Sequence, residues 1–313
     1  MAVNYQTEVA IKQHRIPKQG LHVTYSRDPP KKPLGSGGPI KKAERCIGHN
    51  EPFLVLNGDI FADVDYRELL KVHQEKKAVA TIALYEVKDP TRYGAAKLAK
   101  GNRIEKFVEK PSRRTAPSNL INAGAYILSP EIFHYIPKKR TVSIEREVFT
   151  QLAEEGLLYG CTFNGLWMDI GKPEDYLQIN KNLLDSSTDQ QPKCKIGKNS
   201  IIKTPVSFDK GVSIGEKSVI GPYVVLGRNV NIENNVHIEE SMILSEVFIS
   251  SSSTLEGAII GDGVVIGKRV KIGKGCIVGD HARINNNVEL AEGVSVCPAK
   301  EISESVLTPK CIT

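Results

Sequence analysis

The stretch FLVLNGDIF, residues 53 to 61, decides the fold of the first half of the chain. Its apolar run, 53 to 56, ends at Asn57-Gly58-Asp59, which is typical of a short strand that is buried on both faces and stops at a turn. Gly58 permits a tight turn or the close approach of a ligand. Asp59 then lies just beyond the carboxyl end of the strand, where open α/β sheets bind ligands and a carboxylate can hold a hard cation against phosphate oxygens. A plain turn without chemistry is the alternative that this stretch leaves open.

Helices and strands are expected to alternate on both sides of this stretch. Upstream, the pattern predicts a helix over 6–13, a strand over 21–25 and, after the glycine-rich loop 35–38, a helix over 40–47. Downstream, it predicts a helix over 66–75, strands over 78–87, 103–109 and 120–128, a helix opened by Ser143 and a helix that starts at Pro173. Such alternation indicates an α/β domain with a mostly parallel sheet.

Three polar features of this half have either a functional explanation or a purely structural one. The glycine loop 35–38 leads into a helix, so its backbone N–H groups could hold an anion, although glycine loops are more often flexible connectors. Asp169 lies between apolar neighbours, where a lone buried carboxylate is costly unless it is paired or bound to a metal. Glu109-Lys110 follows an apolar strand directly, and it is either an exposed edge or a pair that binds hydroxyl and phosphate groups.

From residue 196 onward the sequence repeats every six positions. Aliphatic or aromatic residues occur at 196, 202, 208, 214, 220, 226, 232, 238, 243, 249, 255, 260, 266, 272, 278, 284, 290 and 296. This hexapeptide pattern predicts a left-handed parallel β-helix in which the repeated residue points inward and Gly or Asn occupies corners where a positive φ is useful. Three faces per coil then give six coils and a length of about 29 Å. A polar stretch, 185–195, reads as a linker, so we expect two domains, 1–186 and 187–313.

Composition excludes several classes of protein. The 313 residues are 40% apolar and 25% charged, which are globular values, and the net charge is +6. The basic clusters are short and lack interleaved aromatic residues, so nucleic acid is not an expected partner. The six cysteines form no metal-binding pattern and suit reduced thiols. The longest smooth apolar run, 78–84, is too short to span a bilayer, so we expect a cytoplasmic protein without membrane contact.

A set of motifs runs in one order through nearly the whole chain. It comprises Ala2-Val3-Asn4-Tyr5, Pro33-Leu34-Gly35-Ser36-Gly37-Gly38-Pro39, Val55-Leu56-Asn57-Gly58-Asp59, Arg92-Tyr93-Gly94, Phe107-Val108-Glu109-Lys110-Pro111, Ile121-Asn122-Ala123-Gly124, Ser143-Ile144-Glu145 and Leu166-Trp167-Met168-Asp169-Ile170-Gly171-Lys172-Pro173. The set resembles the sugar-1-phosphate nucleotidyltransferases that carry a C-terminal left-handed β-helix, above all the mannose-1-phosphate guanylyltransferases. The resemblance implies an N-terminally incomplete Rossmann-like nucleotidyltransferase domain followed by the β-helix.

The resemblance also implies an activity and a set of site residues. The reaction would be attack of a sugar 1-phosphate, mannose 1-phosphate favoured, on the α-phosphorus of a nucleoside triphosphate, GTP favoured, with release of pyrophosphate. Catalytic roles would fall to Asp59 and Asp169, which would hold Mg²⁺, and to Lys110 at the sugar phosphate. Nucleotide-binding residues would be Gly35, Gly37, Gly38, Asn57 and Gly58, and sugar-binding residues would be Tyr93, Gly94, Glu109 and Asn122.

One departure from the family pattern opens alternatives. The chain has no glycine-rich motif of the form G-x-G-T-R-L-x-P, so the loop that cradles the triphosphate is lacking. We therefore expect either a truncated start or a separate subunit that is inactive alone. A non-catalytic regulatory or sugar-nucleotide-binding subunit is the first alternative. A hexapeptide acyltransferase that uses His237 or His281 is the second, and every alternative predicts homo- or hetero-oligomers through the β-helix.

Overall fold

The computed structural model describes residues 1–3, 7, 22–29, 33–186 and 194–313. The predicted helix over 6–13, apart from residue 7, and most of the predicted linker lie outside these residues. The chain divides into two compact units, Met1–Met168 and Asp169–Thr313. Within the described residues, no helix combines the length and the apolar character that a membrane crossing requires.

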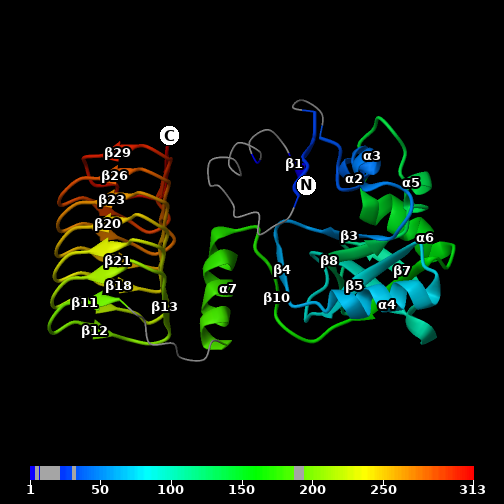
Figure 1. The fold of residues 1–313 in the computed structure, drawn as a ribbon, viewed down its shortest axis with the longest axis horizontal. Coiled ribbons are helices and arrows are strands. Elements are labelled where there is room, and N and C mark those ends of the chain that lie inside the picture. Colours follow the sequence, from blue (N-terminus) through cyan, green and yellow to red (C-terminus); the bar gives the residue numbers. More distant parts are fainter. Residues whose placement is uncertain (4–6, 8–21, 30–32, 187–193) are drawn as a thin grey trace. The chain divides into compact units, whose positions relative to one another are not determined.

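Short strands and helices alternate in the first unit (Figure 1). In chain order they are β1 Ala2–Val3, β2 Ser26–Arg27, α2 Gly37–Lys42, α3 Glu44–Ile47, β3 Phe53–Leu56, β4 Ile60–Ala62, α4 Tyr66–Lys76, β5 Ala80–Glu86, β6 Gly94–Leu98, the 3₁₀ helix η1 Lys100–Asn102, β7 Ile104–Glu109, β8 Leu120–Leu128, α5 Ile132–Tyr135, the π-helix η2 Ile144–Phe149, α6 Thr150–Glu154, β9 Leu158–Thr162 and β10 Trp167–Asp169. The second unit begins with α7, Pro173–Ser186. The helices predicted near 66, 143 and 173 are confirmed, whereas the single helix predicted over 40–47 is two short helices, α2 and α3. The predicted strand over 21–25 is wrong, because described residues 22–25 are not a strand and the strand begins at Ser26.

The main sheet has the strand order β7-β6-β8-β5-β9, and β3 also pairs with β8. The expectation of a mostly parallel sheet is wrong. Among the described pairs of this sheet only β5 with β9 is parallel, whereas β8 runs antiparallel to β3, β5 and β6. β3 and β5 do run in one direction, as the intervening helix predicts, but β8 inserts between them from far along the chain. Local alternation of helices and strands cannot reveal such an insertion.

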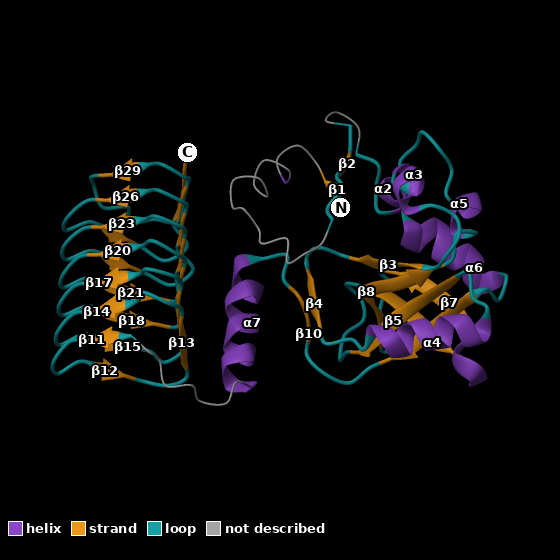
Figure 2. Ribbon diagram, viewed as in Figure 1, coloured by secondary structure: helices purple, strands orange, loops and turns teal. Residues whose placement is uncertain are grey.

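Helices cover the two faces of this sheet (Figure 2). On one face Leu69 of α4 packs with Ile121 and Ala123 of β8 and with Trp167. On the other face η2, α6 and α2 pack against side chains of β5 and β7. Alternate residues of β8 therefore serve two separate cores, which is why this strand is almost continuously buried.

The strand β3 differs from the prediction that it is buried on both faces. Phe53 stacks on Phe133 with ring centroids 5.5 Å apart, and Val55 packs against the same core. Leu54 and Leu56, by contrast, are 42% and 51% exposed. The reason is that β3 pairs with β8 on one side only and has one of its faces uncovered among the described residues.

The second unit contains a parallel β-helix with three sheets (Figure 1). One sheet has β11 Lys195–Ile196, β14 Ser213–Ile214, β17 Asn231–Ile232, β20 Phe248–Ile249, β23 Val265–Ile266, β26 Arg283–Ile284 and β29 Glu301–Ile302. The next has β12 Ile201–Ile202, β15 Val219–Ile220, β18 His237–Glu239, β21 Thr254–Glu256, β24 Lys271–Ile272 and β27 Glu289–Leu290. The last has β13 Val206–Phe208, β16 Val224–Leu226, β19 Met242–Ile243, β22 Ile259–Ile260, β25 Ile277–Val278, β28 Ser295–Val296 and β30 Cys311–Ile312. The solenoid thus has about seven coils, not the predicted six, because β29 and β30 extend it beyond position 296, where the regular hexads end.

The predicted inward positions are confirmed from Ile214 onward, whereas Ile196 is 44% exposed and Ile202 and Phe208 are half-buried. A second inward set lies two residues before the confirmed positions. From Ile214 to Val296 every predicted position is buried. The residue two places earlier is buried as well, usually Val, as in Val230 and Val264. Where Ser takes that place, it is used for hydrogen bonding. The Oγ of Ser253 donates to Gly267 O at 2.8 Å and accepts from Val270 N at 3.1 Å, so a buried hydroxyl satisfies two backbone groups of the next coil.

The prediction that Gly or Asn occupies corners with positive φ is confirmed three residues after the inward position, for example at Gly263, Gly275, Asn229 and Asn287, although Arg269 and His281 also occupy such corners. The glycines directly after the inward positions lack a positive φ, apart from Gly221. The glycines have another purpose, since a Cβ on Gly267 would lie 2.6 Å from Asn286 Oδ1 in the next coil. They permit the coils to stack closely.

Candidate functional site

The turn after β3 presents an exposed carboxylate beside the end of the sheet. Asn57 N–H donates to Gly124 O at 2.8 Å, which fixes the first residue of the turn against β8. Asp59 is exposed, and nothing lies within 4 Å of the point where Gly58 would carry a Cβ. Gly58 also lacks a positive φ, so the turn itself does not require glycine. The open space beside it suits the predicted approach of a ligand.

Two predicted site residues, Asn57 and Asn122, meet at the phenol of Tyr126. Asn122 Nδ2 donates to the Tyr126 hydroxyl at 3.1 Å, and its Oδ1 accepts from Gly124 N–H at 3.0 Å. The side-chain amide of Asn57 also lies close to this hydroxyl. Burial is the main cause that raises the pKa of Tyr126, and the nearby Glu145 adds to it. Tyr126 is therefore a neutral anchor for two amides at one edge of the sheet.

Two further predicted residues, Gly94 and Glu109, are paired across β6 and β7. Glu109 Oε2 lies 2.8 Å from the point where Gly94 would carry a Cβ, so the carboxylate occupies the space that a side chain would fill. Burial, and then the charge of Glu145, raise the pKa of Glu109. Because Ala95 pairs with Ile121 in antiparallel register, Gly94 also lies beside Asn122. The structure thus brings Asn57, Gly94, Glu109 and Asn122 to one region.

Lys110 and Tyr93 lie next to this group. The Lys110 side chain is exposed, and its backbone has a positive φ of 49°. Its N–H donates to Tyr93 O at 2.9 Å. The Tyr93 ring makes an edge contact with Trp167, with centroids 5.1 Å apart. Trp167 in turn donates from Nε1 to Ala123 O at 3.1 Å. A continuous aromatic contact therefore supports the backbone that carries Lys110.

Glu145 is a candidate that the sequence prediction assigned only to a helix start. Its Oε2 accepts from Ser36 Oγ at 2.5 Å and from Ser143 Oγ at 2.7 Å. This carboxylate is the shared electrostatic cause behind the raised pKa values of Glu109 and Tyr126. Tyr126 was also missed. The period-two alternation of its strand, which places residues 122, 124 and 126 on one face, is the sequence signal that could have revealed it.

The glycine loop is explained by close packing against the segment 140–144. Gly35 has a φ of 74° and a Cβ on it would lie 2.3 Å from Val142 O. The N–H of Gly37 donates to the same carbonyl at 2.9 Å, and a Cβ on Gly38 would lie 2.6 Å from Leu34 Cβ. Gly35 and Gly38 therefore have a structural reason, and the predicted contact of the loop with a nucleobase stays a prediction.

Asp169 is the last residue of β10, a strand that pairs with β4. It is half-buried, and its Oδ1 accepts from Gly171 N–H at 3.0 Å. The predicted pairing of Asp59 with Asp169 stays a prediction. No group of three or more metal-binding side chains occurs among the described residues. Mg²⁺ does not need one, because it is commonly held by one or two carboxylates together with substrate phosphates. The exposed Asp59 carboxylate offers the hard oxygen donor that this ion prefers, so the residues fit Mg²⁺.

The β-helix histidines of the acyltransferase alternative have ordinary surroundings. His281 is exposed at a corner with a φ of 59°. His237 Nε2 lies 3.9 Å from Glu239 Oε2 on the outer side of β18. Nothing in this geometry favours acyl transfer over a surface role.

Family models match both parts of the chain. The model described as nucleotidyl transferase matches residues 1–186, and one described as GMPPB C-terminal domain matches residues 202–312. The chain belongs to the nucleotidyl transferase family. The match covers more than half of the chain and includes every predicted site residue. The resemblance drawn from the motifs is confirmed.

Curated relatives of this nucleotidyl transferase are named as mannose-1-phosphate guanylyltransferases. The catalytic subunit beta from Danio rerio is 40% identical over 195 residues, which is 62% of this chain and 53% of that protein. The mannose-1-phosphate guanyltransferase from Saccharomyces cerevisiae is 39% identical over 198 residues, 62% of this chain and 54% of that protein. The chain thus spans about half the length of the curated relatives it matches.

A solved structure agrees with the nucleotidyl transferase fold. It is a putative glucose-1-phosphate thymidylyltransferase from Bacillus anthracis, 22% identical, with a TM-score of 0.50 over 61% of this chain and 78% of that chain. At this identity the likeness supports the fold alone.

Proposed function

We propose that this nucleotidyl transferase chain takes part in forming GDP-mannose from GTP and mannose 1-phosphate, with release of pyrophosphate. The observation that supports this most is the convergence of Asn57, Gly94, Glu109 and Asn122 next to the exposed Asp59 turn. The names of the curated relatives favour mannose and guanine over other sugars and bases. A cytoplasmic location and oligomers formed through the β-helix belong to the same proposal.

The sugar would bind at the residues that converge on β6, β7 and β8. Glu109 would accept hydrogen bonds from hydroxyl groups, and Asn122 would both donate and accept. Tyr93 and Gly94 would border this sugar, and the absence of a side chain at Gly94 lets the Glu109 carboxylate lie close to the strand. Lys110, which is exposed, would offset the charge of the sugar phosphate.

The nucleotide would lie along the turn after β3. Asp59, with Asp169 as a second candidate ligand, would hold Mg²⁺, which when bound would offset charge on the triphosphate. Asn57 and Gly58 would border the phosphates, and Gly35, Gly37 and Gly38 would lie near the base. The work of these residues would be to position two crowded phosphate groups for in-line attack, which is how proteins catalyse phosphoryl-type transfers in general.

Pyrophosphate release by the purified chain with Mg²⁺, GTP and mannose 1-phosphate tests this proposal. We expect release that falls at least 100-fold in Asp59→Asn, because a neutral amide holds Mg²⁺ far less well than a carboxylate. Glu75→Gln removes one charge from the exposed side of α4 and is the matched control, so it should keep the activity. Gly58→Ala should fold normally, because the space beside Gly58 is open, yet lose activity if a ligand approaches there.

A folded chain that releases no pyrophosphate would contradict activity of this chain alone. The regulatory alternative then makes a different prediction, namely that the chain binds GDP-mannose, or raises the rate of an active relative, without turnover of its own. Equal release by the native chain and Asp59→Asn would instead contradict the role of Asp59.

A further inference from the structure

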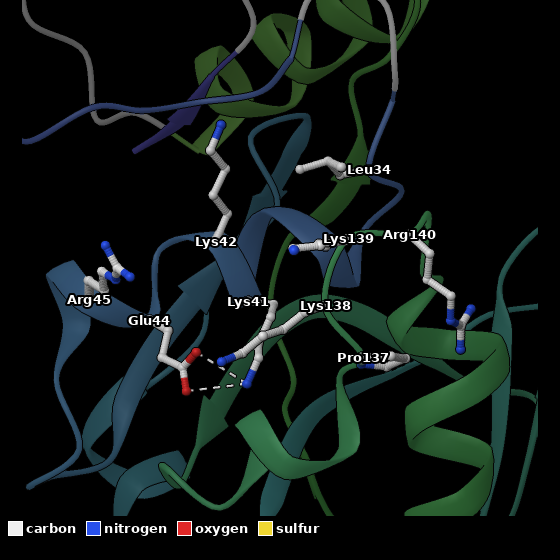
Figure 3. A pocket seen from close by; sticks show the side chains of 10 residues that line it. Leu34, Lys41, Lys42, Glu44, Arg45, Pro137, Lys138, Lys139 and Arg140 are labelled. Atoms are coloured by element: carbon white, nitrogen blue, oxygen red, sulfur yellow. Dashed lines mark hydrogen bonds and ion pairs between the residues drawn. The ribbon is translucent and has the colours of Figure 1, made fainter.

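A basic pocket lies beside the glycine loop, and Gly38 is the one predicted site residue in its lining (Figure 3). It has a volume of about 320 Å³, within the range of small-molecule sites, which starts near 300 Å³. One wall comes from α2 and α3, and the other from the loop 137–140 before η2. Asp59, Glu109 and Asn122 do not line it. Its lining is thus distinct from the residues proposed to bind the sugar.

The lining of this pocket is strongly basic. Six of its ten residues are cations and one is an acid; the cations are Lys41, Lys42, Arg45, Lys138, Lys139 and Arg140, and the acid is Glu44. Like charges that are gathered in a concave surface repel each other and attract anions. How strongly this pocket attracts an anion depends on how many of these cations are neutralised by carboxylates of the protein.

Three carboxylates balance part of this charge. Lys41 Nζ lies 3.1 Å from Glu44 Oε2 and donates to Phe133 O at 2.6 Å. Figure 3 shows Lys138 reaching toward the same Glu44 carboxylate, whose pKa is lowered by its neighbouring cations despite an opposing effect of burial. Arg140 pairs with Glu147 at 2.6 Å.

Lys42 bonds to Arg27 O and lies near the carboxylate of Asp28, the third acid. Among the described residues Arg45 makes no ion pair, and Arg45 and Lys138 are both exposed side chains of the lining. Lys41 and Lys42 lie in the last turn of α2, where positive charges interact favourably with the helix dipole, so they have a structural role. The helix dipole does not explain the basic run 138–140, which comes from a loop on the opposite wall.

We infer that this pocket, defined by α2, α3 and residues 137–140, binds a small anion with a chain of phosphates, either pyrophosphate or the phosphates of a nucleotide. Lysine and arginine side chains from two walls can contact several phosphate oxygens at once, as a linear polyphosphate requires. The small concave shape favours such a ligand over an extended nucleic acid strand, which uses stacking aromatic side chains along a groove. Apart from Gly38, the pocket shares no residue with those that the proposed reaction uses.

Titration calorimetry with pyrophosphate, in EDTA and without Mg²⁺, tests this inference on the full chain. We expect binding that weakens as KCl rises from 50 to 300 mM, because salt screens exposed charges. The double variant Arg45→Ala/Lys138→Ala should bind about tenfold more weakly or worse, since it removes two cationic donors from opposite walls. The variant Arg67→Ala/Lys100→Ala removes the same charge from exposed sites elsewhere and should bind as the native chain does.

Further arms identify the ligand and separate this pocket from the proposed active site. Competition by GDP but not by orthophosphate would support a nucleotide source, and competition by neither would support pyrophosphate itself. Asp59→Asn should leave the binding intact, so failure of the proposed reaction would not affect this result. The inference is overturned if pyrophosphate fails to bind, if the double variant binds it unchanged, or if a poly-glutamate peptide binds while pyrophosphate does not.

Discussion

At the scale of single residues, His73 shows how the first unit satisfies a buried polar group. The side chain is 1% exposed and lies between two hydroxyls. Ser129 Oγ donates to Ala78 O at 2.8 Å, so it accepts from His73 Nε2 at 2.9 Å. His73 Nδ1 then accepts from Thr81 Oγ1 at 3.0 Å, which requires the neutral imidazole. Burial accordingly lowers the pKa of His73 from 6.5 to about 4.

This lowered pKa predicts that acid destabilises the first unit. The unfolded chain binds a proton at His73 below about pH 6.5, and the folded chain does so only near pH 4. The stability that depends on a neutral His73 is therefore fully present above pH 6.5 and is lost as the pH falls toward 4. Between pH 7.5 and pH 5.0 this residue should cost about 2 kcal/mol of unfolding free energy.

Urea unfolding of the native chain and of His73→Gln at both pH values measures this effect. Glutamine fills the site with a side chain that does not titrate, so the variant should be less stable at pH 7.5 but less sensitive to acid. The same loss of stability in both proteins would assign the acid sensitivity to other groups.

At the scale of elements, the coils of the β-helix are limited by how closely their backbones approach. Gly267 and Gly273 occupy equivalent places after successive inward residues. A Cβ on Gly267 would lie 2.6 Å from Asn286 Oδ1 and 2.7 Å from Asn286 N, whereas the nearest atom to a Cβ on Gly273 would be Glu292 N at 3.1 Å. Neither glycine has a positive φ, so the difference between them is one of space.

We expect Gly267→Ala to destabilise the β-helix by about 1–3 kcal/mol, the usual cost of overpacking. Gly273→Ala should cost clearly less, because a shift of a few tenths of an ångström relieves its contact. Thermal unfolding of the two variants makes the comparison directly. Equal effects would show that backbone freedom, not coil spacing, explains these glycines.

These elements also show what the sequence could predict. From Ile214 to Val296 the predicted inward positions are correct, because they depend on which residues share a face, a local property. The close packing around the glycines that follow them was not predicted, because it involves residues such as Asn286 in the next coil. Likewise, Asn57 and Asn122 were predicted as site residues from the motif resemblance, but the insertion of β8 beside β3 and the position of the buried Tyr126 next to the two amides depend on pairing between distant segments. Prediction failed where partners far apart in sequence decide the structure.

At the scale of the whole molecule, the two units have separate apolar cores. The first unit packs around side chains such as Ile82 and Phe149, while the β-helix has one continuous core that includes Ile249 and Ile266. Both Ile82 and Ile266 are fully buried. Domains with their own cores can unfold as independent cooperative units.

We therefore expect two unfolding transitions that respond to different substitutions. Ile82→Ala should lower the midpoint temperature of one transition, and Ile266→Ala should lower that of the other. Each substitution should reduce the free energy of unfolding of its own unit by about 2–5 kcal/mol, which is typical of large-to-small changes in a core. Calorimetry of the native chain and both variants would show this. A single transition that both substitutions shift equally would mean that the units unfold together.

The nearly constant number of residues in each coil of the β-helix restricts how such a protein can gain or lose length during evolution. Each strand pairs with the strand one coil later, as Ile214 does with Ile232 and Leu226 with Ile243. Duplication of one whole coil leaves every later residue on its own face, whereas an insertion of three residues would turn apolar side chains outward along all later coils. Whole coils are thus the steps in which insertions and deletions can be accepted. The single-residue shifts before Ile243 and Ile260, both still fully buried, show the small departures that the repeat tolerates.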